Sequence, residues 1–284
     1  MYRNNKKVPL GQPPEGDERV YYYIHGGGFV RCSAHPDSFS SLVPRLILNS
    51  SSKIRRAFCV EYRLAAAFPV AHGPFPSALI DALAGYVYLV KEVGFSPENI
   101  VVFGDSAGAN IALSLIRYLV EYRGDRNVPD LPSPPGSLVL ISPWVDLGTS
   151  HSEPGSSFHA NAKSDWLPPP LPDGTQGYVA RSVTGPHGLD FARYCEYISP
   201  ASRDIKNVSF VGFPKTFVTY GTGEIFYDQV QDLLNRMVSD MGKGDVSVYE
   251  QKDTFHDILG YAYPWFQPEI NNILHEIDRY VSSL

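Results

Sequence analysis

The run of small residues at positions 104–108, Gly-Asp-Ser-Ala-Gly, constrains the fold of this chain more than any other feature. A strand pattern of β-branched and aromatic residues at 100–103 leads into it, and a helix pattern follows from Ala107. Small residues around Ser106 permit a sharp turn from strand to helix that larger side chains would block. Such a turn lifts the Ser106 hydroxyl above the sheet edge, at a helix N-terminus that favours a developing negative charge.

A second run of small residues, Gly26, Gly27 and Gly28, follows His25 at the end of the strand pattern at 20–24. A backbone without side chains can approach a substrate carbonyl closely and direct N–H groups at its oxygen. No Gly-Lys-Ser or Gly-Lys-Thr follows these glycines, so a phosphate-binding loop is the weaker interpretation. The two runs together indicate a nucleophilic serine beside a loop that stabilises an anion.

The two runs predict specific roles for their residues. Ser106 is the expected nucleophile, because its hydroxyl stands at the turn. The expected oxyanion hole consists of the N–H groups of Gly27, Gly28 and Ala107, and the expected supporting residues of the two turns are His25, Gly26 and Asp105.

Strand and helix patterns alternate along the chain, as in a mostly parallel sheet with helices on its faces. The strand patterns lie at 20–24, 57–61, 100–103, 138–142, 215–220 and 246–250. The helix patterns lie at 37–49, 77–93, 107–122, 227–241 and 268–282. A chain of 284 residues, 43% of them hydrophobic, is long enough for one large α/β core. We therefore predict a single domain over residues 1–284 with a sheet of about six strands.

Three further segments agree with one known family. They are Glu-Tyr-Arg-Leu-Ala at 61–65, Phe-Pro-Ser-Ala-Leu-Ile-Asp-Ala at 75–82 and Ser-Pro-Trp-Val-Asp-Leu at 142–147. From about residue 20 to the C-terminus, the chain resembles the HGGG-type, hormone-sensitive-lipase-like esterases and lipases of the α/β-hydrolase superfamily. The resemblance implies an α/β-hydrolase fold. It also implies a serine carboxylic-ester hydrolase, an esterase or deacetylase, that acts on a small-molecule ester through an acyl-enzyme, with no metal and no cofactor.

One irregular stretch, residues 144–213, interrupts the alternation of strands and helices. It is rich in proline, glycine and serine. A loop of that length within a compact domain usually has a function. In the resembled family, an insertion after the strand that ends in Ser-Pro-Trp contributes to a cap over the active site. We therefore expect residues 144–213 to form a cap or lid.

The α/β-hydrolases carry their catalytic residues in the chain order serine, acid, histidine. Of the eight histidines, His256 in the loop after the last strand pattern fits the base. The segment Gly-Thr-Gly-Glu-Ile-Phe-Tyr-Asp at 221–228 resembles the family's Gly-x-x-Asp-x-Leu-x-Asp, which aligns Glu224 with the catalytic acid. Asp228, one helical turn later, is the alternative acid, although a carboxylate there also suits the start of the following helix.

The segment before the first strand pattern departs from the family. Only about twenty residues precede the strand at 20–24, whereas cap helices and two further strands usually precede it in the family. The resemblance therefore implies that the N-terminal strands and lid are missing and that the strand at 57–61 lies at a sheet edge. An exposed apolar edge promotes association. We expect residues 1–16, or a second copy of the chain in a homodimer, to cover this edge.

Composition excludes some classes of protein. The net charge of −6 argues against a nucleic-acid partner, and no run approaches the roughly twenty apolar residues of a membrane span. Three scattered cysteines and the lack of a signal peptide favour a reducing, cytoplasmic compartment over a disulfide framework or a metal site. Two alternatives to ester hydrolysis stay open: an amidase or acyltransferase with the same triad, and a non-catalytic small-molecule binding protein on the same scaffold.

Overall fold

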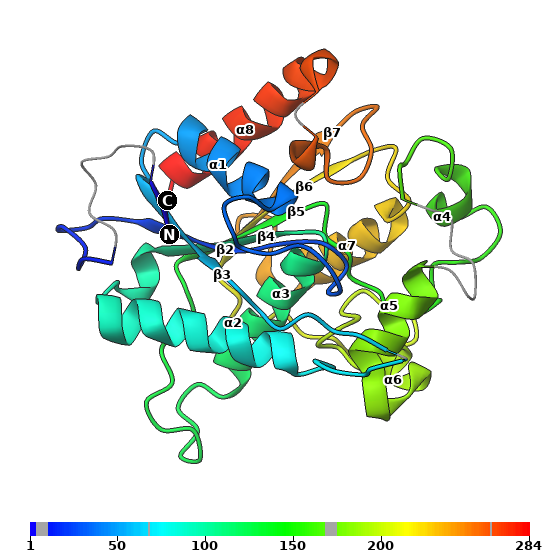
Figure 1. Ribbon diagram of the computed structural model, residues 1–284, viewed down its shortest axis with the longest axis horizontal. Coiled ribbons are helices and arrows are strands. Elements are labelled where there is room, and N and C mark those ends of the chain that lie inside the picture. The colour runs from blue at the N-terminus through cyan, green and yellow to red at the C-terminus, as the bar shows by residue number, and fades with distance from the viewer. Residues whose placement is uncertain (4–10, 68, 168–174, 262) are drawn as a thin grey trace.

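A seven-stranded sheet forms the centre of the computed structural model, which describes residues 1–3, 11–67, 69–167, 175–261 and 263–284 (Figure 1). The strands are β1 (Tyr2–Arg3), β2 (Val20–Ile24), β3 (Arg56–Val60), β4 (Ile100–Asp105), β5 (Ser137–Ile141), β6 (Lys215–Gly221) and β7 (Val246–Gln251). They lie in the order β1-β3-β2-β4-β5-β6-β7. Strands β2 to β7 pair in parallel, and β1 pairs antiparallel with β3. The predicted mostly parallel α/β architecture is therefore confirmed.

Helices cover both faces of the sheet. The helices on these faces are α1 (Leu42–Ser50), α2 (Ser77–Tyr88), α3 (Ala107–Glu121), α7 (Tyr227–Met241) and α8 (Gln267–Ser282). Figure 1 shows α1 and α8 on one face and α2 and α3 on the other. Alternate residues of β2 enter the two cores: Tyr22 packs in the core with α2, α3 and α7, whereas Tyr21 and Tyr23 pack with α1 and α8. Burial on both faces explains why the central strands read as continuous apolar runs.

The predicted helices and strands agree with the observed ones to within a few residues, with three exceptions. The helix expected at 77–93 is α-helical only as far as Tyr88 and ends in a π-helical turn at Leu89–Val93. The helix expected from residue 37 begins as a single 3₁₀ turn at Phe39–Ser41 and becomes α-helical only at Leu42. The stretch expected to be irregular holds three short helices, α4 (Ser157–Ala160), α5 (Thr175–Thr184) and α6 (Leu189–Tyr194). Residues 168–174 of that stretch lie outside the described residues.

Residues near the N-terminus cover the edge strand β3. Tyr2 pairs with Ala57, and Arg3 pairs with Arg56. The buried Arg56 guanidinium also donates to the Glu18 carboxylate at 2.8 Å. The sheet thus has seven strands where the sequence predicted about six, because two residues are too few to carry a strand pattern. Residues 2 and 3 thus cover the first two residues of β3 from within the chain, and a homodimer at this edge stays a prediction.

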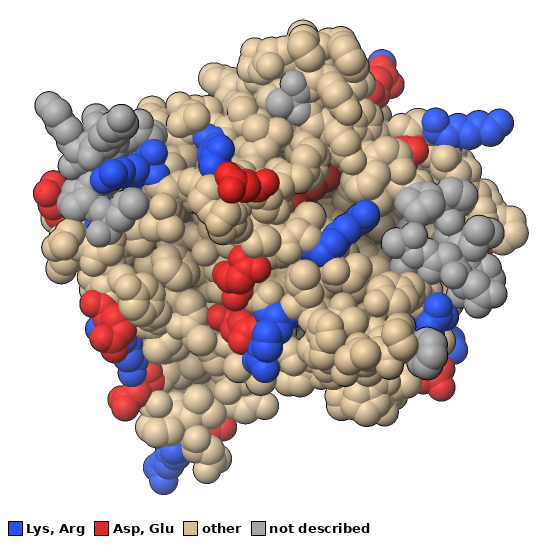
Figure 2. Space-filling view, in the orientation of Figure 1, with Lys and Arg blue, Asp and Glu red and all other residues tan. Residues whose placement is uncertain are grey.

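The surface carries charges of both signs. On the face drawn in Figure 2, Lys and Arg side chains are interspersed among Asp and Glu rather than gathered in a stripe. Nucleic-acid-binding surfaces usually gather their basic residues on one face. Among the helices that the structure describes, none is long and apolar enough to cross a membrane.

Candidate active site

Ser106 occupies a strained turn between β4 and α3. Its φ of 51° and ψ of −117° are rare for a residue with a side chain. Two backbone hydrogen bonds hold the turn: the Ser106 N–H donates to the Ile141 carbonyl at 2.9 Å, and the Trp144 N–H donates to the Ser106 carbonyl at 3.2 Å. The turn is therefore fixed by the neighbouring strand β5 and the segment that follows it.

The glycine after the turn is required by close packing of backbone on backbone. A Cβ atom at Gly108 would overlap the carbonyl oxygen of Ile24 at the end of β2. Only glycine leaves the room that helix α3 needs to start this close to the sheet. The small residue that the sequence pattern placed here thus has a steric cause in the fold.

Gly108→Ala is expected to lower the free energy of unfolding by about 1–3 kcal/mol, because the added methyl group must displace backbone of β2. Alanine's higher helix propensity, worth up to about 1 kcal/mol, opposes this loss without cancelling it. Gly244→Ala is the matched control, since a Cβ there meets nothing within 4 Å. Urea unfolding of both variants checks the prediction, and equal midpoints would contradict it.

Three predicted residues meet at the carboxyl ends of the strands. The Ser106 Oγ lies 2.8 Å from His256 Nε2, and His256 Nδ1 lies 3.1 Å from the Glu224 Oε2. They come from the turns that follow β4, β7 and β6, and all three side chains are buried. Because Glu224 as a carboxylate can only accept, it favours the tautomer with hydrogen on Nδ1. This leaves Nε2 free to accept the Ser106 proton.

The Glu224 carboxylate is itself held in place. Its Oε1 accepts a hydrogen bond from the Gly221 N–H at 2.6 Å and another from the Ser142 hydroxyl at 2.7 Å. The Ser142 hydroxyl in turn accepts one from the Asp257 N–H at 3.1 Å. Sequence reasoning assigned no role to Ser142 or Gly221, although both stand at the carboxyl ends of strands, where the sites of parallel sheets lie.

The irregular stretch fixes the main chain of His256. The Asp165 carboxylate accepts hydrogen bonds from the N–H groups of His256 (3.2 Å) and Ile225 (2.8 Å). The Trp166 indole N–H donates to the His256 carbonyl at 2.7 Å. Sequence reasoning missed Asp165, since neither a motif nor a periodic pattern includes it.

The environment of His256 shifts its pKa. Burial lowers the pKa of the imidazole. The hydrogen bond to Glu224, together with the negative charges of Glu224 and Asp165, raises it, and the net result is a pKa above the ordinary histidine value. The imidazolium that forms when the ring accepts a proton is thus stabilised by its surroundings.

Asp228 contacts a different part of the chain. Its Oδ2 accepts a hydrogen bond from the Ser157 N–H at 2.7 Å, and its own N–H donates to the Ser157 hydroxyl at 3.0 Å. Ser157 is the first residue of α4, so Asp228 binds the start of α4 to α7. The sequence predicted that Asp228 lies at the start of the following helix, and the structure places it in the first turn of α7. Its contact with the start of α4 is an additional role, at a helix that the sequence did not predict.

The glycine loop faces the same site. Gly27 has a φ of 108°, which side chains rarely permit, and its carbonyl accepts the N–H groups of Val30 and Arg31. Within the part of the chain that is described, the N–H groups of Gly27 and Gly28 have no hydrogen-bond partner. The Ala107 N–H, at the first position of α3, has no partner within its helix. These donors are therefore available to an oxygen atom of a ligand.

Asp105 joins the two turns. It accepts a hydrogen bond from the Tyr23 hydroxyl at 2.5 Å and another from the Gly26 N–H at 3.1 Å. His25 stacks on Tyr62, with the ring centroids 4.2 Å apart, and its Nδ1 lies 2.8 Å from the Gly26 carbonyl oxygen. These contacts make Asp105 and His25 parts of the support beneath the glycine loop.

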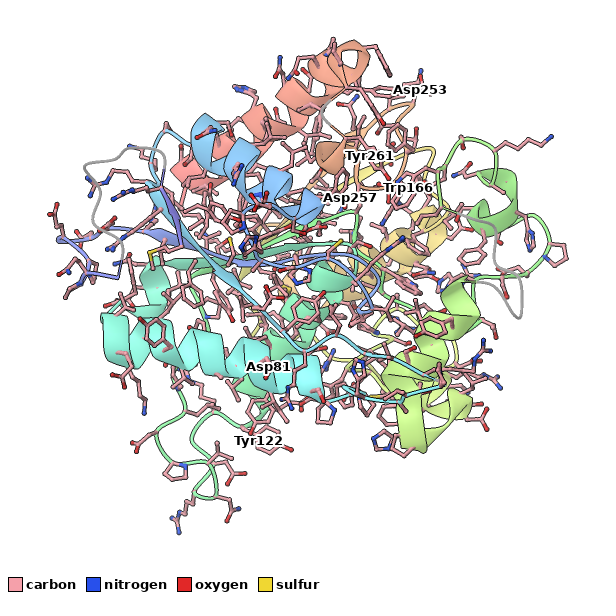
Figure 3. All side chains as sticks on the ribbon, in the orientation of Figure 1. Asp81, Tyr122, Trp166, Asp253, Asp257 and Tyr261 are labelled. Carbon is pink, nitrogen blue, oxygen red and sulfur yellow. The ribbon has the colours of Figure 1, made fainter. Side chains whose placement is uncertain are left out.

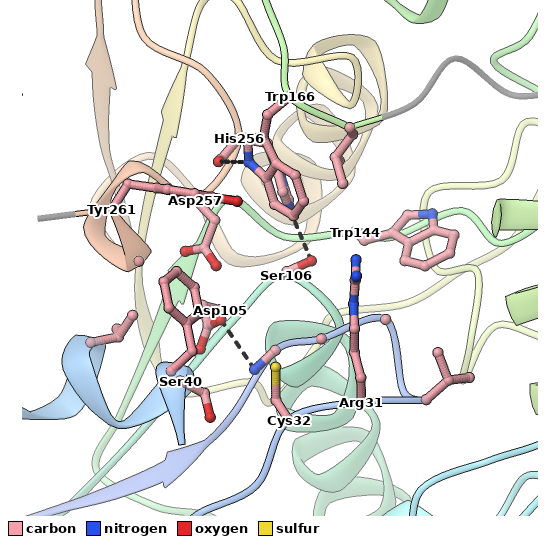
Figure 4. A pocket seen from close by; sticks show the side chains of 18 of the residues that line it. Arg31, Cys32, Ser40, Asp105, Ser106, Trp144, Trp166, His256, Asp257 and Tyr261 are labelled. Carbon is pink, nitrogen blue, oxygen red and sulfur yellow. Dashed lines mark hydrogen bonds between the residues drawn. The ribbon is translucent and has the colours of Figure 1, made fainter. Parts of the chain in front are cut away.

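A cavity of about 380 Å³ opens over these residues (Figure 4). Ser106, His256 and the glycine loop lie along its wall, and most of the remaining wall is apolar. Its wall includes the aromatic side chains of Phe39, Trp144, Trp166, Phe226 and Tyr261. A mostly apolar cavity of this size with a few convergent polar groups suits a small organic ligand. Among the described residues, no group of three metal-binding side chains is present.

Known proteins resemble this chain over most of its length. The profile of one family, described as the alpha/beta hydrolase fold, matches residues 21–260, a range that contains Ser106, Glu224 and His256. The esterase LipU of Mycobacterium tuberculosis is 27% identical over 274 residues, which cover 95% of this chain and 79% of LipU.

Solved structures also resemble this chain over most of its length. The structure of EstE5 from a crystal soaked with p-nitrophenyl butyrate has a TM-score of 0.66 and 27% identity, and the match covers 92% of this chain and 76% of EstE5. The structure of an esterase from the bacterial hormone-sensitive lipase family has a TM-score of 0.68 and 25% identity, with 95% of this chain and 78% of that chain covered.

Proposed function

The chain belongs to the alpha/beta hydrolase fold family, and on this premise we propose that it is a serine carboxylic-ester hydrolase with Ser106, His256 and Glu224 as its catalytic triad. One observation carries the proposal. The continuous hydrogen-bonded series from Ser106 Oγ through His256 to Glu224 lies at the wall of a cavity lined by free backbone donors. Its relatives LipU and EstE5, an esterase and a protein soaked with an ester, support the same chemistry.

Acylation follows from this geometry. His256 Nε2 takes the Ser106 proton as Oγ attacks the ester carbonyl carbon, and the C=O electron pair moves to the oxygen. The N–H groups of Gly27, Gly28 and Ala107 are proposed to hold that oxyanion. Glu224 accepts the Nδ1–H and stabilises the imidazolium. When the intermediate collapses, the bond to the alkoxide breaks, His256 returns its proton to it, and the alcohol leaves.

Deacylation repeats these steps with water. His256 takes a proton from the water as its oxygen attacks the acyl-enzyme, and the same oxyanion hole holds the charge. The bond to Ser106 then breaks, Oγ regains the proton from His256, and the carboxylic acid leaves. No step needs a group beyond those named.

We further propose that residues 144–213 act as a cap on a single domain over residues 1–284. Trp144, Trp166, Leu167 and Val179 of this stretch line the cavity. Other residues of the stretch, such as Phe158 and Val183, are buried in the hydrophobic core, to which Trp144 and Val179 also belong. The stretch thus forms part of the cavity wall and is also packed against the core of the domain, as a cap must be.

Labelling with a fluorophosphonate, followed by an ester panel, tests the function. We expect one covalent adduct per chain, on the peptide that contains Ser106, because an activated serine displaces fluoride. We also expect hydrolysis of p-nitrophenyl acetate and butyrate, with slower cleavage of the matching anilides. Faster cleavage of the anilides would indicate an amidase, and acyl transfer to an added alcohol in preference to water would indicate a transferase. An unlabelled serine would indicate a binding protein.

A further inference from the structure

Arg31 is attached rigidly to the glycine loop. Its N–H donates to the Gly27 carbonyl at 3.2 Å, and a Cβ atom at Gly27 would overlap the Arg31 carbonyl oxygen. The loop therefore turns back on itself between these two residues. The backbone from which the Arg31 side chain starts keeps a fixed place beside the proposed oxyanion hole.

The Arg31 side chain lines the same cavity as Ser106. Figure 4 shows it extended in the pocket with Trp144, Trp166 and Ser106 around it. The guanidinium carbon lies 6.0 Å from the centroid of the Trp166 ring, and the Trp166 indole donates to the His256 carbonyl. The positive charge of Arg31 thus lies next to the residues proposed to react, and the Arg31 residue is exposed to solvent.

The charge of Arg31 is not neutralised within the described part of the chain. Other arginines there form ion pairs, such as Arg63 with Asp81 at 2.8 Å and Arg203 with Asp232 at 2.6 Å. Arg31 forms no ion pair and donates no hydrogen bond from its side chain to another described residue. Its contact in the cavity is with the face of an aromatic ring, which leaves the N–H donors of its guanidinium for a ligand.

Two acidic residues, Asp105 and Asp257, line the cavity, but they do not make it a binding site for a cationic ligand. Asp105 already accepts hydrogen bonds from Tyr23 and Gly26. Burial raises the pKa of Asp257 well above its usual range, and the nearby charge of Asp105 raises it further. The surroundings of Asp257 thus disfavour its charged form, and the carboxylate of Asp105 is already occupied by two hydrogen bonds.

We propose that Arg31 forms an anion subsite and that the enzyme prefers esters which carry a carboxylate on their acyl or alcohol part. This inference rests on the proposed hydrolase function. A guanidinium binds a carboxylate through paired N–H donors, and an apolar wall of Trp144, Val179 and Phe226 suits the rest of such a molecule.

Two matched substrate pairs test the subsite. On the acyl side, ethanol release is compared for monoethyl and diethyl glutarate. On the alcohol side, acetate release is compared for 4-acetoxybenzoate and its methyl ester. The readout is the ratio of kcat/KM for the anionic ester to that for its neutral partner. Arg31→Gln should lower this ratio at least about tenfold for one pair or both, because it removes a charge-assisted hydrogen bond.

A matched control separates this local effect from net charge. Arg126→Gln makes the same change on an exposed arginine in the loop after α3, the loop in which Tyr122 lies far from Trp166 in Figure 3. It should leave the ratio within about twofold. Arg31→Lys should retain part of the preference, because it keeps the charge but loses the paired donors.

Salt gives a readout that needs no variant. Raising NaCl from about 0.05 to about 0.5 M should lower the ratio of the wild-type enzyme, since screening weakens attraction at an exposed charge. If circular dichroism shows that Arg31→Gln is unfolded, the salt dependence of the wild-type ratio alone tests the subsite. A ratio that neither Arg31→Gln nor salt changes, for both pairs, would overturn the subsite. If the wild-type enzyme hydrolysed neither neutral ester nor any p-nitrophenyl ester, the hydrolase function itself would fail.

Discussion

Ser106→Ala should reduce kcat for p-nitrophenyl butyrate by about six orders of magnitude and abolish the initial burst of p-nitrophenol. The oxygen that forms the acyl-enzyme is then absent, and neither His256 nor the oxyanion hole has a nucleophile to assist. Stopped-flow absorbance measures the burst, and long incubations at high enzyme concentration measure the residual rate. We expect a residual rate above that in water, because the backbone donors and the cavity remain.

The control for this prediction is Ser247→Ala. Ser247 is exposed on β7 and does not line the cavity, so its replacement should leave burst and turnover within about twofold of wild type. Both variants should unfold at urea concentrations close to that of the wild-type protein, since each change removes a single oxygen. A normal burst from Ser106→Ala would mean that another side chain is the nucleophile.

The parts of the fold that the sequence predicted are those determined by local pattern. Strand β2 reads as an apolar run because it is buried on both faces, and α8 shows the period of a helix with one buried face. Strand β1 and helix α4 have no such pattern. The first exists because Tyr2 and Arg3 pair with β3, and the second because Asp228 binds the start of its four residues. Both depend on contacts with residues far away in the chain.

The residues of the site also fall into those that local sequence predicts and those that depend on distant parts of the chain. Ser106 and the glycines could be predicted because one short turn and one short loop each need a particular local sequence. The supports of His256 and Glu224 could not, because Asp165, Trp166 and Ser142 reach them from distant segments. The role proposed for Arg31 could not be predicted either. It depends on the absence of an ion pair to Arg31 among the described residues, which only the folded chain reveals.

Glu224→Gln should lower kcat/KM about 10³- to 10⁴-fold, whereas Asp228→Asn should change it less than about fivefold. An amide at position 224 cannot stabilise the imidazolium, and its NH₂ group can turn His256 to the wrong tautomer. The amide that replaces the Asp228 carboxylate keeps an oxygen that can accept from the Ser157 N–H, so the contact between α7 and α4 survives. The two changes are chemically equivalent and lie four residues apart, which makes each the control of the other.

The pH profile separates a role in catalysis from a role in folding. Ester hydrolysis needs His256 unprotonated, so kcat/KM rises with pH through the pKa of His256. The hydrogen bond and the charge of Glu224 both raise that pKa. Glu224→Gln removes the charge, and the midpoint of the acidic limb should therefore move to lower pH, while Asp228→Asn should leave it in place. A purely structural loss would scale the whole profile and keep its midpoint. If Asp228→Asn caused the larger loss together with the downward shift, Asp228 would be the acid that orients His256.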